Sequence, residues 1–117
     1  MLFETPQPRE INWQLQKIDD WKIIGDIMMI ADVKQIRDLK IKIIKSAATT
    51  DSLTIKLKKA TSKTAASADV ATKTITAAAN SVADFGSVDV PAGGYLSLVV
   101  TTETGNVQAI SITGEII

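Results

Sequence analysis

Carboxylate side chains are the first place to look for chemistry, because this 117-residue sequence contains no histidine and no cysteine. Asp19 and Asp20 are adjacent, and Asp26 and Asp32 follow on an expected strand. Adjacent residues of an extended chain point to opposite faces, so we interpret the first pair as solvent-facing rather than as an acid–base pair. A serine or threonine nucleophile would also need a base within hydrogen-bond reach, and only lysines or carboxylates remain for that role. We therefore expect no enzymatic activity.

Cofactor motifs do not occur either. The sequence has no glycine-rich phosphate loop, no G-x-S-x-G turn and no EF-hand loop. The Gly93-Gly94 pair after Pro91 is instead typical of a tight turn before a strand that begins at Tyr95. We expect no cofactor, and calcium bound by a surface loop stays open as an alternative.

Composition and charge narrow the class of protein. Hydrophobic residues make up 45% of the chain and charged residues 22%, as in a folded domain, and the length suits one domain. Lys plus Arg and Asp plus Glu are both 13, so a general nucleic-acid binder is not expected. The longest apolar run, 27–31, is too short to cross a bilayer, and the first residues do not read as a signal peptide. We expect neither nucleic acid nor membrane as a partner.

The body of the chain has the pattern of a β-protein. Ile, Val and Thr together supply 37 of the 117 residues, and β-branched side chains favour a pleated sheet. Apolar and polar residues alternate in several short segments, as strands with one buried face require. We predict strands near 26–33, 36–46, 52–60, 70–77, 82–90, 94–102 and 107–116. Turn residues lie between them, so we predict a jelly-roll-like antiparallel β-sandwich.

Two segments fit this pattern less well. Residues 60–84 hold nine alanines, which favour a helix, but alternating threonines favour a loop followed by a strand, the interpretation we prefer. Residues 1–22 suit either a strand or a helix, and Pro6 and Pro8 make their start extended. We predict an N-terminal arm over 1–22, which anchors the chain to another subunit or to a capsid, and a sandwich over 23–117.

Lysines are concentrated in the middle of the chain. Nine basic and two acidic residues lie between positions 34 and 63. Lys40, Lys42, Lys56 and Lys58 occupy the polar positions of two consecutive strands, so we predict that they form one outward basic face. An acidic partner surface would complement that face, and protection of the sheet against other sheets is the alternative. A nucleic-acid patch is disfavoured because this region lacks aromatic residues for stacking.

Aromatic residues are concentrated at the N-terminus. Three of the five aromatic side chains, Phe3, Trp13 and Trp21, fall within the first 21 residues. Tryptophan often carries binding energy at interfaces, which favours an arm that packs on another chain. Packing of both tryptophans against their own sandwich is the alternative. The predicted anchoring residues are Phe3, Ile11, Trp13, Leu15 and Trp21.

The order of strands and turns resembles a jelly-roll domain of bacteriophage virion proteins. The resemblance runs from about residue 23 to residue 115, through the segments 24–33, 36–42, 47–57, 88–101 and 107–112. Domains of that family occur as capsid decoration or cement proteins and at the tips of head or tail fibres. The sequence has no repetitive shaft and no coiled-coil heptads, which favours the decoration type.

The resemblance implies a virion structural protein that stabilises the assembled capsid by bridging capsomers on its surface. Its expected partners are the major capsid protein or another virion protein, and further copies of itself, as a trimer rather than a dimer. The alternative is a fibre or receptor-binding module that recognises a host cell-surface glycan. Tyr95 is the only aromatic residue of the body that we expect to be exposed for sugar stacking.

Overall fold

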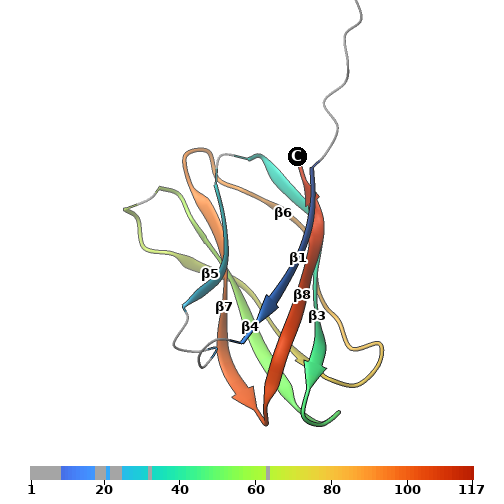
Figure 1. Cartoon of the computed structure of the whole chain (residues 1–117). Coiled ribbons are helices and arrows are strands. Elements are labelled where there is room, and N and C mark those ends of the chain that lie inside the picture. Colours follow the sequence, from blue (N-terminus) through green and yellow to red (C-terminus); the bar gives the residue numbers. More distant parts are fainter. Residues whose placement is uncertain (1–8, 18–20, 22–24, 32, 63) are drawn as a thin grey trace, which may run out of the picture.

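The chain folds into two packed antiparallel β-sheets (Figure 1). The structure is a computed structural model, and it describes residues 9–17, 21, 25–31, 33–62 and 64–117. The strands are β1 Arg9–Gln16, β2 Asp26–Ala31, β3 Gln35–Ser46, β4 Ser52–Ala60, β5 Ala68–Thr76, β6 Ala83–Asp89, β7 Tyr95–Thr104 and β8 Val107–Ile116. The seven strands predicted in the body are present, with ends that agree to within two residues. Residues 68–76 form a strand, so the threonine alternation outweighed the alanines.

The strand order is that of a jelly roll. Sheet A has the order β1-β8-β3-β6 and sheet B has the order β2-β7-β4-β5. The first strand pairs with the last, the second with the seventh, the third with the sixth and the fourth with the fifth, all antiparallel. Two further pairings, β3 with β8 and β4 with β7, join these pairs into the two sheets. This nested pairing is what a long antiparallel ribbon gives when it rolls up, and it confirms the predicted fold class.

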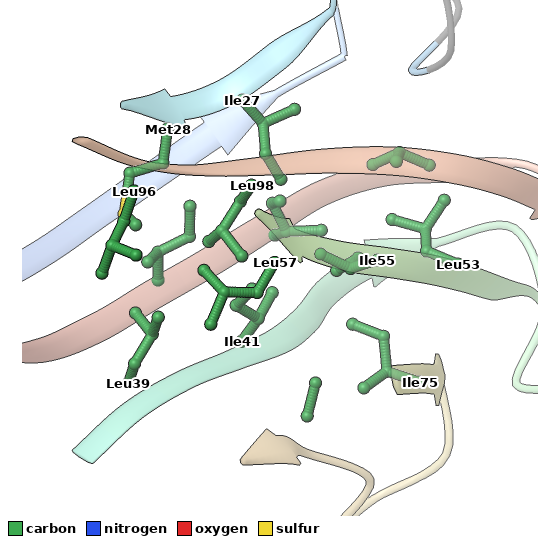
Figure 2. Close-up of a cluster of buried hydrophobic side chains, with 14 of the residues drawn as sticks. Ile27, Met28, Leu39, Ile41, Leu53, Ile55, Leu57, Ile75, Leu96 and Leu98 are labelled. Atoms are coloured by element: carbon green, nitrogen blue, oxygen red, sulfur yellow. The ribbon is translucent and has the colours of Figure 1, made fainter. Parts of the chain in front are cut away.

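The core lies between the sheets and consists almost entirely of aliphatic side chains. Leu39 and Ile41 project into it from β3 of sheet A, and Ile55 and Leu57 project from β4 of sheet B. All four side chains are without solvent exposure. Figure 2 shows them gathered with side chains of β2 and β7. The alternating apolar positions predicted to face inward on β3, β4, β7 and β8 are all buried.

The predicted boundary between an arm and a sandwich does not match the structure. Residues 9–16, which the sequence assigned to the arm, form β1 and pair with β8 in one continuous register. Trp21 also belongs to the core, with 1% of its surface exposed. The physical reason is that Ile11 and Trp21 add apolar bulk to a small core of aliphatic side chains, against which Phe85 packs only in part. Residues 1–8 lie outside the described residues.

Turns from several strand pairs meet at the end of the sandwich where β7 leads into β8. Asp51 is 5% exposed there, and its Oδ2 accepts hydrogen bonds from the backbone N–H groups of Ala47 and Ala48 at 3.0 and 2.9 Å. Its backbone oxygen accepts a bond from the N–H of Ala77. Gly105, at φ +77°, lies against the Asp51 carboxylate where a Cβ would overlap it. Asp51 thus ties together three of the turns at this end.

Candidate interaction surfaces

Of the four carboxylates considered for chemistry, the structure describes one. Asp26 is exposed on β2, and Asp19, Asp20 and Asp32 lie outside the described residues. Among the residues that the structure describes, no three Asp or Glu side chains are grouped so that they could hold a metal ion. In the same part of the chain, no helix is long and apolar enough to cross a membrane.

The five predicted anchoring residues have different environments. Phe3 lies outside the described residues. Ile11 and Trp21 are buried, and Leu15 packs partly buried against the core. Of the four that the structure describes, only Trp13 is open to solvent, at 41% exposure. The structure therefore leaves Trp13 accessible to a partner and uses Ile11 and Trp21 inside this chain's own sandwich.

Hydrogen bonds hold Trp21 in place. Its indole Nε1 donates to the backbone oxygen of Val107 at 2.9 Å. The backbone N–H of Val107 donates in turn to Glu103 Oε2 at 3.0 Å, and Lys17 Nζ lies 2.9 Å from both oxygens of the same carboxylate. The Lys17 backbone N–H also donates to the oxygen of Gln108 at 2.8 Å. These bonds fasten Lys17 and Trp21 to the end of β7 and the start of β8.

Trp13 lies on the inward-facing side of an edge strand. It is paired with Ile112 of β8, which is fully buried. Trp13 is two residues from both Ile11 and Leu15, so all three side chains lie on the same side of β1. Because β1 is the outermost strand of sheet A, its inward side is covered less completely than that of β8. Ile11 on the same face is nevertheless 2% exposed, so the edge position accounts for only part of the exposure of Trp13.

The four predicted lysines do not form one face. Lys40 and Lys42 are exposed on the outer side of sheet A, whereas Lys56 and Lys58 are partly buried on the outer side of sheet B. The prediction of a single basic face was wrong because β3 and β4 follow each other in the chain but belong to opposite sheets. Lys56 also forms an ion pair with Asp69 at 3.2 Å, whereas Lys40 and Lys42 form no ion pair within 4.0 Å among the described residues.

On sheet A the lysines face a row of amides across β8. Register places Lys40 beside Thr113, Lys42 beside Ser111 and Lys45 beside Ala109 on one side of β8. On its other side, β8 pairs with β1, and Thr113, Ser111 and Ala109 each have a partner there. Those partners are Asn12, Gln14 and Gln16. Short side chains along β8 therefore separate a basic row from a neutral amide row; we call this surface the sheet A face.

Two shallow depressions lie at the ends of the sheet A face. One, of about 280 Å³, is lined by Glu10, Asn12, Asp38 and Lys40, among others. The other, of about 360 Å³, is lined by Gln16, Lys17, Lys45 and three residues of β8 and its turn. Asp38 has φ +51° and lies where the register between β3 and β8 shifts, so a bulge forms the wall of the first depression.

The amide row and Lys45 were not among the predicted site residues. The amides alternate with Ile11, Trp13 and Leu15, so the same periodicity that marks a strand indicates their common outward face. Their position opposite the lysines depends on the pairing of β1 and β3 with the same strand, which joins residues far apart in the sequence.

Comparison with known proteins adds no functional assignment. No protein-family model matches the chain. No curated protein matches it either. The fold and its surfaces therefore carry the functional argument.

Proposed function

We propose that this chain is a non-enzymatic virion structural protein that decorates a capsid surface and bridges capsomers. The observation that carries the proposal is the jelly-roll strand order combined with the exposed basic row of the sheet A face. The resemblance to virion jelly-roll domains supports the same assignment. Its partner is the major capsid protein or another virion protein.

The sheet A face supplies the contact to an acidic partner surface. Among the described residues the ion pairs within 4.0 Å are Lys17–Glu103 and Lys56–Asp69. Lys42 and Lys45 form no ion pair there, and neither does Lys40, although Asp84 of β6 is its partner in the register. A partner carboxylate would gain charge-assisted hydrogen bonds without first breaking an internal pair. Weak contacts of this kind add up when they repeat over a symmetric shell. A protein that binds the assembled shell but not its separate subunits stabilises the shell by mass action.

A matched pair of charge variants tests the proposal. Lys40→Gln/Lys42→Gln/Lys45→Gln removes three charges from sheet A, and Lys56→Gln/Lys58→Gln/Lys59→Gln removes three from β4 of sheet B. Each purified variant is added to virus particles that lack the protein, and the fraction that sediments with them is measured. We expect the sheet A variant to lose retention and the β4 variant to keep it. Equal retention of both variants would refute the role of the sheet A face, and no retention of the unmodified protein would refute the decoration role.

Deletion of residues 1–22 is not a suitable test of anchoring. It would remove β1 and Trp21 from the sandwich, so lost retention would report unfolding as well as lost contact. Point variants at exposed positions avoid this ambiguity.

The amide row favours one second candidate, a module that recognises an anionic glycan. Side-chain amides both donate and accept hydrogen bonds, as sugar hydroxyls require, and lysines would face the sugar's acidic groups. Tyr95, the predicted stacking residue, is partly buried on sheet B and is paired with Ala31 and Ala60, away from this row. A glycan array distinguishes the two candidates: selective binding of acidic glycans that is lost in Asn12→Ala/Gln14→Ala would favour the module.

A further inference from the structure

The four outer strands of the sandwich differ in how regularly they are built. Sheet A ends in β1 and β6, and sheet B ends in β2 and β5. The register between β2 and β7 shifts between Asp26 and Met28. The register between β5 and β4 shifts between Leu57 and Lys58 of β4. The pairing of β6 shifts twice around Leu39. Bulges of this kind twist an edge away from other strands and protect it from pairing.

β1 has none of these protective features in the part of the chain that the structure describes. Its eight residues pair with β8 in one uninterrupted register, from Arg9 with Ile116 to Gln16 with Ala109. Residues 11–16 contain no lysine, no proline and no other charged residue. A regular edge strand with an uncharged segment of this length is a template for another strand. The exposed Trp13 lies near its centre.

We propose that β1 pairs with β1 of a second copy of this chain, antiparallel about a two-fold axis, so that the two sheets A join into one. This pairing concerns the isolated protein and does not depend on the proposed virion role. It closes with two copies, because a two-fold contact uses the same edge on both partners. It therefore gives a dimer, where the sequence favoured a trimer.

One register gives all three apolar side chains of β1, Ile11, Trp13 and Leu15, apolar partners in the second copy. Opposite residues of antiparallel strands share a face, so the axis must pass through a residue rather than between two if the inward sides of both copies are to coincide. An axis at Trp13 places the two copies of Trp13 opposite each other, Ile11 opposite Leu15, and Asn12 opposite Gln14. Apolar side chains then meet apolar ones on the inward side, and amides meet amides on the outward side. An axis at Asn12 would instead pair the apolar Leu15 with the charged residue at position 9.

Added charges on β1 test the pairing. In Asn12→Lys/Gln14→Lys, two lysines from each copy face each other, while the exposed positions allow the fold to remain. Like charges directly opposite each other repel, so we expect the dimer dissociation constant to rise about tenfold or more. The matched control, Ala68→Lys/Thr72→Lys, adds the same charge at exposed positions of β5. Sedimentation equilibrium of the full chain and both variants over a concentration series measures the effect.

Each outcome of the sedimentation experiment bears on the pairing. A dimer in the full chain and the control, with a weakened dimer in Asn12→Lys/Gln14→Lys, supports the proposal. A monomer at every concentration, a trimer, or an unweakened dimer in the β1 variant overturns it.

A disulfide cross-link gives a second test that needs no loss of association. The chain contains no cysteine, so Trp13→Cys introduces a single thiol. Opposed residues of an antiparallel pair lie within the Cα distance that a disulfide spans. We expect Trp13→Cys to form a covalent dimer on oxidation and Thr72→Cys, on β5, to stay largely monomeric. No excess of cross-linking at position 13 over position 72 would overturn the proposed axis.

Discussion

Replacement of Trp21 by phenylalanine separates its role in the core from the role of an external anchor. Trp21 is 1% exposed and donates to the Val107 oxygen at 2.9 Å. Phenylalanine keeps part of the ring but removes the donor, and a buried group left without its partner costs about 1–3 kcal/mol. With the smaller ring, we expect a total loss of about 2–3 kcal/mol in the free energy of unfolding.

The loss converts into a measurable change in melting temperature. For 117 residues, an unfolding entropy of about 2.1 cal/mol/K per residue means that each kcal/mol lowers Tm by about 4 °C. Trp21→Phe should therefore lower Tm by about 8–12 °C. Circular dichroism during heating measures the change, at a protein concentration that is the same for every variant.

Trp13→Phe is the control, because Trp13 is 41% exposed. At concentrations at which the chain is monomeric, its replacement should change stability by less than about 0.5 kcal/mol. Each variant also retains one tryptophan, so fluorescence reports one site at a time. Emission should be blue-shifted in Trp13→Phe, where only the buried Trp21 remains. A Tm for Trp21→Phe within about 2 °C of the parent would refute the assignment of Trp21 to the core.

Three further substitutions test the packing and the turns. Glu103→Ala removes the acceptor for the Val107 N–H and the partner of Lys17, and should cost about 1.5–3 kcal/mol in urea unfolding, with Glu103→Gln costing less. Asp51→Ala removes the acceptor for two turn N–H groups and should cost about 2 kcal/mol by the same measurement; an unchanged midpoint would contradict its role in joining the turns. Leu57→Ala leaves a cavity in the core and should cost about 2–5 kcal/mol, and a cost below about 1 kcal/mol would contradict its burial.

The strands were predictable because each one carries its signal locally. In β4, Leu53, Ile55 and Leu57 alternate with polar residues, and this period of two requires one buried face whatever the rest of the chain does. The ends of the strands were predictable from turn residues such as those at 91–94. The fold class followed from the number and spacing of such segments.

The candidate surfaces were predicted less well, because they depend on which strands become neighbours. Lys40 and Lys56 have the same local pattern, yet the first lies on sheet A and the second on sheet B. Trp13 and Trp21 were grouped by their nearness in the sequence, whereas one lies at an exposed edge and the other is buried and bonded to Val107. Local pattern gives the face of a strand but not its neighbours.

Short antiparallel strands around an aliphatic interior follow from the order of residues alone, because side-chain periodicity and turn chemistry act over a few positions. Three other features depend on how distant strands pair: β1 belongs to the sandwich, the lysines divide between two faces, and amides lie across β8 from Lys40 and Lys42. The first two reflect the assignment of strands to sheets, and the third reflects the pairing of the first and third strands with the last. Such pairing is selected by the burial of the whole core rather than by any one segment.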